Sequence, residues 1–421
     1  MTGPRLTAGV GKSVIGLPPD VYPLDGFAGE HDNLHARAVL LDDGSQRVAL
    51  VVVELTSIPE DAVRELREAA ATAGRVAGGN TVVCASHTFS APHLQAAGAG
   101  GRSDALLREA VRDAVVRSVT EARRTMRSAR VGFGRGTCGV NVNRDVLTAD
   151  GWWLGADESG VSDKSVGVVR IEDDGGQPLA ILMNYAVQSS VMNESHTRTG
   201  ERLVTSDLAG AACRHVEESY GDGAVALFLI GAAGDQAPFL TANRYVAHRG
   251  GAYTRADVHE AGHLLVDLLG ERLGAEAVRV SEGIRCAGTG GGLRVVNTST
   301  TVHAQVAPAR MQDLRPVRDY PFEPDGKAEV PIDVVRIGDI VLVGLRAELS
   351  SGTGLGIKED SPFAGTVVMT MANGAAKYMA DAASYDRSTY EAMNSRYARG
   401  SAEAVASKVG EILKELRGDD L

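Results

Sequence analysis

The chain has 421 residues, of which 44% are hydrophobic and 23% are charged, and its formal net charge is −11. This composition is typical of a folded globular protein and excludes a disordered or fibrous chain. The acidic excess, without a dense cluster of lysine and arginine, argues against nucleic acid as a partner. The longest hydrophobic runs, residues 48–53 and 224–230, are far shorter than the roughly 20 residues that cross a bilayer, so we expect no membrane partner.

The N-terminal residues lack the hydrophobic core of a secretion signal, which predicts a cytoplasmic protein. The four cysteines, Cys84, Cys138, Cys213 and Cys286, are widely separated and form no Cys-x-x-Cys pair. We therefore expect reduced thiols with a structural role.

Strand and helix patterns alternate through the first two thirds of the chain. The expected strands are residues 36–41, 48–55, 81–86, 166–171, 179–187 and 224–231, and the expected helices are residues 60–74, 104–126 and 207–220. Long β-like stretches follow at residues 282–306 and 329–345, before a final helix from about residue 401. The pattern predicts an α/β fold of mixed β-sheets flanked by helices. We expect one domain over residues 1–421, with an alternating part (1–280) and a β-rich part that ends in a helix (281–421).

The sequence HEAGH at residues 259–263 has the spacing of a zinc protease motif. On a helix, His259 and His263 would share one face and could ligate zinc, while Glu260 would activate its bound water. The sequence does not identify a third ligand. The alternative, which we favour, is an amphipathic helix with the histidines at the border of its buried stripe. That expected stripe consists of Val258, Ala261, Leu265 and Leu268 or Leu269.

Reactive side chains follow several of the expected strands. In open α/β folds, binding and active sites usually lie in the loops after the strands. His87 follows residues 81–86, and Gln188 follows residues 179–187, with His196 further along the same loop. Asp235 follows residues 224–231, and Glu348 follows a hydrophobic run that ends at Leu345. A later segment supplies Tyr378, Tyr385 and Tyr390.

Seven segments in this order are similar to motifs of a known family. They are HDNLHARAVLLDDGSQRVALVVVEL, ASHTFSAP, GVNVNRD, NYAVQSSVM with TSDLAG, GAAGDQAP, GLRAELSSGTG and YMADAASYDRSTYEA. Together they resemble the neutral/alkaline ceramidases, zinc-dependent hydrolases that cleave the amide bond of N-acyl sphingoid bases. The resemblance implies the ceramidase catalytic fold, and we expect it here without the C-terminal immunoglobulin-like domain of the family's extracellular members.

The resemblance also implies a set of site residues. The family's zinc ligands fall on His87, Gln188, Glu348 and Tyr378, and Arg144 and Tyr390 fall on groups that orient the substrate or handle protons. Since an amide oxygen is a poor zinc ligand, we expect the metal to be held by His87, Glu348 and Tyr378. The expected catalytic residues are Arg144, Tyr390 and Asp235.

Three positions depart from the family pattern. Gln188 replaces the second histidine ligand, Phe89 replaces a histidine that assists the zinc-bound water, and Ala237 replaces the active-site serine. Phe89 cannot move a proton, and Ala237 cannot act as a nucleophile. We assign Phe89, Gln188, Ala237 and Trp153 to substrate binding.

The first functional hypothesis is a ceramidase-like enzyme, rebuilt for biosynthesis, that acts on an amide- or ester-type bond of a small soluble molecule with zinc as cofactor. The second is a metal-free enzyme on the same scaffold that catalyses cyclisation, condensation or elimination. A non-catalytic ligand-binding relative is the third, and a metalloprotease based on HEAGH is the last. Association into a homo-oligomer stays open.

Overall fold

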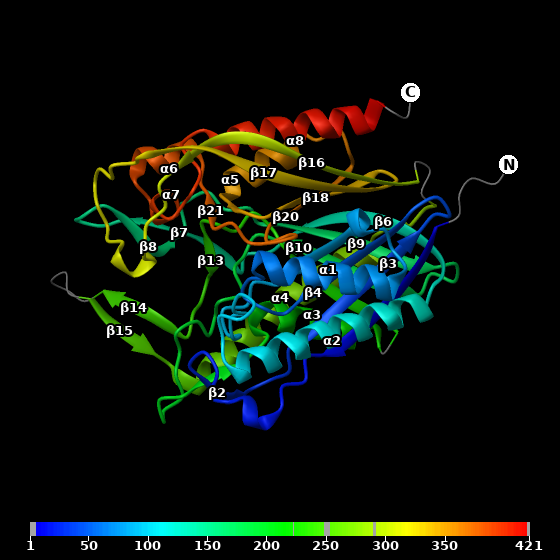
Figure 1. The fold of residues 1–421 in the computed structure, drawn as a ribbon, viewed down its shortest axis with the longest axis horizontal. Coiled ribbons are helices and arrows are strands. Elements are labelled where there is room, and N and C mark those ends of the chain that lie inside the picture. Colours follow the sequence, from blue (N-terminus) through cyan, green and yellow to red (C-terminus); the bar gives the residue numbers. More distant parts are fainter. Residues whose placement is uncertain (1–5, 222, 248–252, 289–291, 419–421) are drawn as a thin grey trace.

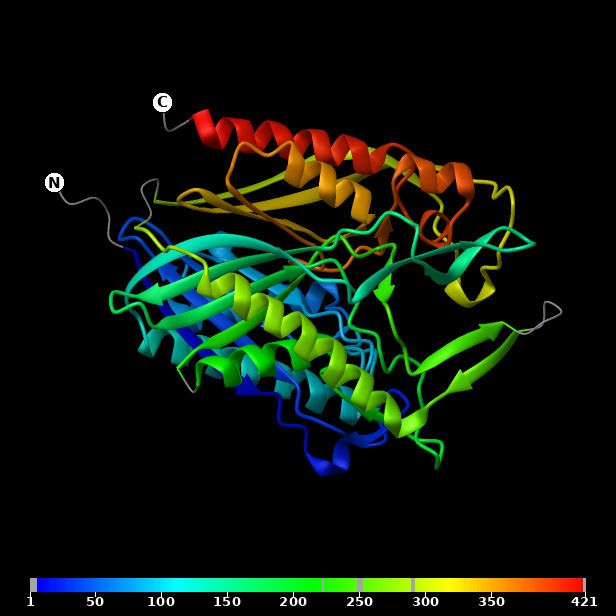
Figure 2. The ribbon, with the colours of Figure 1, turned by 180° about the vertical axis from the view of Figure 1, so that it is seen from behind.

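Two stacked β-sheets lie between two layers of helices (Figures 1 and 2). The computed structural model describes residues 6–221, 223–247, 253–288 and 292–418. Figure 1 shows helices α1 to α4 below the first sheet and helix α8 above the second sheet. The expected α/β class, with mixed sheets flanked by helices, is confirmed.

The first sheet has eight strands in the order β12-β10-β9-β6-β1-β3-β4-β5. In chain order these are β1 (Thr7–Val14), β3 (His35–Asp42), β4 (Arg47–Val53), β5 (Thr81–Ala85), β6 (Arg127–Thr137), β9 (Ser165–Asp173), β10 (Pro178–Tyr185) and β12 (Val225–Ile230). Strand β5 runs parallel to β4, and β12 runs parallel to β10. The central strands are almost continuously hydrophobic because both faces of the sheet are covered.

Four helices cover the outer face of this sheet: α1 (Glu60–Gly74), α2 (Arg102–Arg124), α3 (Asp207–Tyr220) and α4 (Gly262–Glu282). Each presents a hydrophobic stripe to the sheet, as Leu107, Val111 and Val115 of α2 do. The cluster that results is the largest part of the core. Its strand side includes Ala38, Leu40 and Val51.

The second sheet has four strands in the order β16-β17-β18-β20. They are β16 (Leu293–Gln305), β17 (Pro324–Ile337), β18 (Ile340–Leu345) and β20 (Gly365–Met369). Helices α5 (Ser351–Glu359) and α8 (Ser401–Gly418) pack on its outer face, against Val341, Val343 and Val368. Between the two sheets lies a separate hydrophobic layer that includes Val39, Leu342 and Val367.

Short elements connect the layers near the ends of the strands. They are β2 (Phe27–Glu30), β7 (Asn141–Leu147), β8 (Trp152–Asp157), β11 (Arg202–Val204), β13 (Gln236–Pro238), β14 (Asn243–Ala247), β15 (Tyr253–Asp257), β19 (Glu348–Leu349), β21 (Tyr378–Met379), α6 (Ala382–Arg387) and α7 (Tyr390–Met393). Single 3-10 turns lie at Pro19–Val21, Gly78–Asn80, His259–Ala261 and Met311–Asp313. No helix in the described ranges is long and apolar enough to cross a membrane.

Two local predictions are wrong. The β-like pattern from residue 282 is not a strand at its beginning, because α4 continues to Glu282 and β16 starts only at Leu293. Residues 289–291 of that stretch lie outside the described residues. The buried stripe expected around HEAGH is wrong at Ala261, which is exposed, and omits the buried Val266, whereas Leu269 is buried and Val258 and Leu265 pack against the core as expected.

Strand β1 and helix α2 approach each other closely at glycine. A Cβ atom at Gly9 would lie 1.9 Å from the carbonyl oxygen of Ala122, an atom of the helix backbone that cannot rotate away. We expect Gly9→Ala to lower the free energy of unfolding by about 1–3 kcal/mol, measured by urea denaturation. Gly16→Ala is the matched control, because nothing lies within 4 Å of its Cβ position. Equal losses of stability in the two variants would show that this close approach is not a constraint.

Candidate active site

Six polar residues from segments far apart in the sequence meet at one end of the sheets. An isolated parallel bridge between Thr88 and Ser189 joins the loop after β5 to the loop after β10, and so brings His87 and Gln188 together. Strands β19 and β21 pair in parallel with Glu348 opposite Tyr378. We refer to the group formed here as the central cluster, which consists of His87, Arg144, Gln188, Glu348, Tyr378 and Glu391.

His87 is held in an uncommon backbone conformation and by both ring nitrogens. Its φ angle is 63°, in the left-handed region that few non-glycine residues adopt. Its Nδ1 lies 2.5 Å from the carbonyl oxygen of Thr56, and its Nε2 lies 3.1 Å from Oε2 of Glu348. The carbonyl of Thr56 can only accept, and Glu348 can only accept while it is ionised, so an ionised Glu348 requires hydrogen on both ring nitrogens and makes the ring an imidazolium.

The ion pair shifts both pKa values in the direction that favours charge. Burial alone lowers the pKa of His87, but the charge and hydrogen bond of Glu348 and the carbonyl of Thr56 outweigh it and raise that pKa above its ordinary value. Burial alone raises the pKa of Glu348, but the charge of His87, together with Arg144, brings it below its ordinary value. His87 and Glu348 therefore form a buried pair of opposite charges.

Gln188 connects this pair to a second one. Its side-chain Nε2 donates to Oε2 of Glu348 at 2.8 Å, and its Oε1 accepts from Nη1 of Arg144 at 2.8 Å. Only this orientation of the amide gives each end a complementary partner. Arg144 in turn donates from Nε to Oε1 of Glu391 at 2.7 Å. The chain of contacts from His87 to Glu391 is thus continuous.

Aromatic rings pack against Arg144 and His87. The guanidinium carbon of Arg144 lies 5.2 Å from the ring centre of Tyr378 and 5.8 Å from that of Tyr390. Trp153 meets Tyr390 edge to face, with ring centres 5.5 Å apart. Phe89 also packs edge to face against His87, with ring centres 4.7 Å apart. Phe89, Trp153 and Tyr390 are half-buried, whereas the residues of the central cluster are buried.

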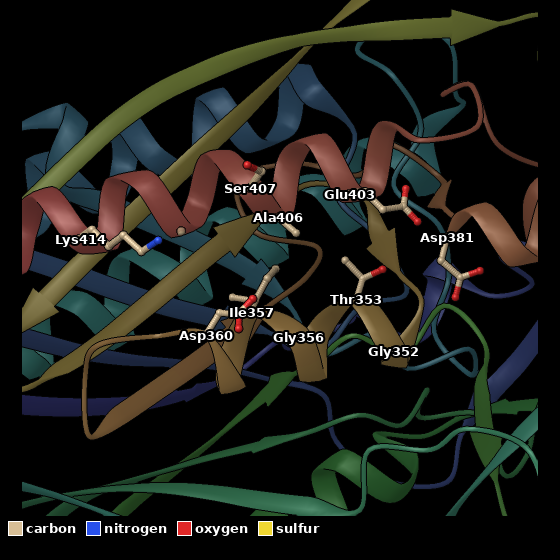
Figure 3. Close-up of a pocket in the computed structure, with 11 residues that line it drawn as sticks. Gly352, Thr353, Gly356, Ile357, Asp360, Asp381, Glu403, Ala406, Ser407 and Lys414 are labelled. Carbon is tan, nitrogen blue, oxygen red and sulfur yellow. The ribbon is translucent and has the colours of Figure 1, made fainter.

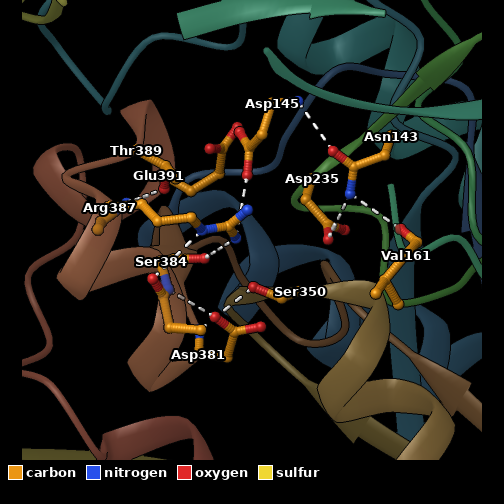
Figure 4. A network of polar contacts seen from close by, with 12 residues as sticks. Asn143, Asp145, Val161, Asp235, Ser350, Asp381, Ser384, Arg387, Thr389 and Glu391 are labelled. Carbon is orange, nitrogen blue, oxygen red and sulfur yellow. Dashed lines mark hydrogen bonds and ion pairs between the residues drawn. The ribbon is translucent and has the colours of Figure 1, made fainter. Parts of the chain in front are cut away.

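Ala237 and Asp235 belong to the adjoining strand β13 and the turn before it. Ala237, which is half-buried, pairs with Val142 of β7, two residues before Arg144. The carboxylate of Asp235 accepts from the backbone N–H of Ser351 at 2.8 Å, and Figure 4 shows it close to Asn143. Burial raises the pKa of Asp235 to about 6. These contacts cap helix α5 and support the strand that carries Arg144, and a catalytic role for Asp235 stays a prediction.

The sequence pattern did not point to three contributors. Glu391 anchors Arg144, Asp145 lies against Glu391, and the carbonyl of Thr56 holds His87. The adjacency of Asp145 to Arg144 and of Glu391 to Tyr390 was the only available signal. A backbone carbonyl such as that of Thr56 leaves no signal in a sequence.

The HEAGH residues lie elsewhere and do not share a helical face. His259 belongs to a 3-10 turn, and its Nδ1 lies 2.8 Å from the backbone oxygen of His196. His263 lies in the first turn of α4 and stacks on His31 with ring centres 3.4 Å apart. Burial, together with the nearby His31, lowers the pKa of His263 to about 4. These positions argue against a zinc protease and place His196 with these histidines rather than with His87.

The central cluster is a poor fit for the zinc ion that the resemblance implies. Zinc binds unprotonated imidazole and anionic ligands, but Gln188 offers a neutral amide whose N–H group donates to Glu348, at the position where the family pattern has a histidine ligand. The guanidinium of Arg144 adds a fixed positive charge. Within the described ranges, no group of three or more His, Cys, Asp and Glu side chains could hold a metal ion. The donor set therefore does not fit zinc.

A cavity of about 650 Å³ lies away from these residues. It is formed between α5 and α8, with Thr353, Asp381 and Glu403 at one end and Lys414 at the other (Figure 3). No residue of the central cluster lines it. The cavity and the central cluster are therefore separate features.

Comparison with known proteins gives a fold but no sequence family. Neither the protein-family models nor the curated proteins contain a match. Among solved structures, the neutral ceramidase from Pseudomonas aeruginosa is similar with a TM-score of 0.73 and 18% identity, and the match covers 99% of this chain and 75% of that chain. A structure of a ceramidase complexed with C2 is similar with a TM-score of 0.76 and 18% identity, and the match covers 99% of this chain and 76% of that chain. The chain therefore has the fold of the neutral ceramidases, as the order of its motifs predicts.

Proposed function

We propose that the protein is an enzyme that acts on an amide- or ester-type bond of a small polar molecule without a resident zinc ion. The ceramidase fold supports the class of bond. The observation that carries the proposal is the position of Gln188, whose amide joins Glu348 to Arg144 where the family pattern has a histidine ligand. A hydrogen-bonded network of charged groups thus stands in place of the metal.

The residues of the central cluster can supply the required proton transfer. His87 is a buried imidazolium whose proton lies between its Nε2 and Glu348, so the pair can deliver a proton to a leaving group and take it back. Burial raises the pKa of both Tyr378 and Tyr390, and both phenols therefore remain hydrogen-bond donors at neutral pH. Together with Arg144 they can stabilise negative charge on a carbonyl oxygen.

The side chains around the central cluster support a compact substrate. Phe89, Trp153 and Ala237 are half-buried and apolar whereas the central cluster is buried and polar, which suits a molecule with one reactive polar group. The net charge of −11 supports the absence of nucleic acid as a partner. A cytoplasmic location, without a membrane partner, completes the proposal.

Turnover by metal-free protein tests this function. Chelator-treated protein, with zinc content verified by elemental analysis, would be incubated with a panel of N-acyl amines, esters and lactams. We expect turnover without added metal, and its loss in Glu348→Gln and His87→Ala. His93→Ala is the matched control, because His93 forms an exposed pair with Asp25 at 2.6 Å. Turnover that appears only in proportion to added zinc would refute the proposal.

A second candidate is favoured by Ala237 and Phe89. Ala237 provides no hydroxyl nucleophile and Phe89 provides no base to activate water, which suits cyclisation, condensation or elimination better than hydrolysis. Reaction in isotopically labelled water distinguishes the two. Label in the product indicates hydrolysis, and an unlabelled product indicates cyclisation, condensation or elimination. Tight binding of a panel member without turnover would instead indicate a ligand-binding protein.

A further inference from the structure

A pair of carboxyl groups lies buried behind Arg144. Asp145 and Glu391 are each 1% exposed, and Figure 4 shows their carboxyl groups side by side. One carboxyl oxygen of Glu391, Oε1, accepts a hydrogen bond from Nε of Arg144. The other oxygen of Glu391 and both oxygens of Asp145 are buried without a hydrogen-bond donor among the described residues.

Two ionised carboxylates in this arrangement would be strongly unfavourable. The charged groups that face Asp145 are Glu391 on α7, Arg144 on its own strand, Asp235 before β13, and Arg387 on α6. Arg387 is partly exposed, and its Nη2 lies 3.6 Å from Oδ2 of Asp145, beyond hydrogen-bond distance. A buried anion without a donor costs several kcal/mol, and a like charge in contact adds to that cost.

A single proton removes the conflict. If Asp145 is protonated, its hydroxyl can donate to Glu391, which gives the unpartnered carboxyl oxygens one shared hydrogen bond. Glu391 then keeps its negative charge for Arg144. Burial and the neighbouring Glu391 and Asp235 also raise the pKa of Asp145 to about 9.

We propose that Asp145 is a neutral carboxylic acid whose hydrogen bond fixes the Glu391 carboxylate and thereby positions the guanidinium of Arg144 against Gln188. Asp145 is a positioning residue, since it acts through Glu391 and Arg144. Ionisation would place a second anion beside the guanidinium and draw it away from Gln188. The importance of this for catalysis rests on the proposed function, but the acid pair itself can be tested without a substrate.

Infrared spectroscopy provides that test, because protonated and ionised carboxyl groups absorb at different frequencies. In the difference spectrum between the wild type and Asp145→Asn at neutral pH, we expect the loss of one protonated-carboxyl band. Asp43→Asn is the matched control and should remove a carboxylate band, because several N–H groups donate to Asp43 and lower the pKa of its carboxyl group. Loss of a carboxylate band in Asp145→Asn would overturn the proposal.

A second variant covers the case in which Asp145→Asn does not fold. Burial is the largest cause of the raised pKa of Asp145 and remains in Glu391→Gln, but the neighbouring anion is removed, so the protonated-carboxyl band of Asp145 should be lost at a lower pH than in the wild type. Loss of that band at the same pH in wild type and folded Glu391→Gln would contradict the dependence on Glu391. A protein that shows both expected spectra but turns over no substrate would leave the acid pair intact and refute only the proposed enzymatic function.

Stability as a function of pH gives an independent readout. A pKa raised from 3.8 to about 9 means that the folded state keeps a proton that the unfolded chain loses, so stability falls as pH rises between these values. Asparagine does not titrate. We therefore expect the melting temperature of the wild type to fall relative to that of Asp145→Asn as pH rises from about 4 to about 9. A difference that stays constant across this range would exclude the shared proton.

Discussion

Replacing Gln188 by histidine is expected to convert the central cluster into a site that retains zinc. The new imidazole would give the metal a second nitrogen ligand beside His87, with Glu348 and Tyr378 in place to complete a tetrahedral set. The substitution would also remove the side-chain amide that now donates a hydrogen bond to Oε2 of Glu348. The gain in zinc affinity should exceed the roughly 10- to 100-fold effect that a merely supporting residue has on metal binding.

Equilibrium dialysis with zinc, followed by elemental analysis, measures this change. Zinc should also raise the melting temperature of Gln188→His in a concentration-dependent way, because a ligand of the folded state stabilises it. Gln177→His is the control, since Gln177 is exposed in a turn away from the cluster. If folded Gln188→His binds no more zinc than this control, the glutamine is not what makes the donor set unsuitable.

Glu348→Gln is expected to cost the most stability of any single substitution in the central cluster. It leaves His87 buried as an uncompensated cation, and breaking a buried ion pair costs about 3–5 kcal/mol. Activity should be lost with it, because the proton of His87 then has no carboxylate partner. Urea denaturation at a series of pH values measures the loss.

The pH dependence follows from the two pKa shifts. The raised pKa of His87 contributes stability that is complete below its ordinary value of 6.5 and is lost as pH rises through its folded-state pKa. The lowered pKa of Glu348 contributes stability above its ordinary value of 4.5, and this is lost as pH falls through its folded-state pKa. The difference in the free energy of unfolding between wild type and Glu348→Gln should therefore be largest between the two ordinary pKa values, 4.5 and 6.5. Asp25→Asn, at a half-exposed pair, should show little effect, and equal behaviour of both variants would contradict the argument.

The sequence predicted the place of the site better than its contacts. His87 and Gln188 could be placed at one edge because they follow buried strands, and strand ends meet where sheets stop. Tyr378 required the family resemblance, since β21 has only two residues and no periodic pattern. The orientation of Gln188 between Glu348 and Arg144 depends on three-dimensional hydrogen bonds that no spacing encodes.

Other features escaped prediction because long-range packing overrides local pattern. HEAGH has helical spacing, but His259 has a φ angle of 56° and belongs to a separate turn, so α4 starts at Gly262. Leu268 matches the period of a buried stripe and is nevertheless exposed, because α3 covers the face that carries Leu269. Asp145 and Glu391 are 246 positions apart in the chain, and only the folded protein shows that they touch.

The His87–Glu348 ion pair also spans two separately built halves of the molecule. His87 extends the eight-stranded sheet, whereas Glu348 follows β18 of the four-stranded sheet, and the bridge between Cys84 and Ala372 ties the same two layers together. Neither half can assemble the pair alone. Amide exchange at Asn373, whose N–H donates to the carbonyl of Val83 at 2.8 Å, should consequently report the docking of one layer on the other. A fragment ending before β16 should lack the ion pair however well its own helices and strands form.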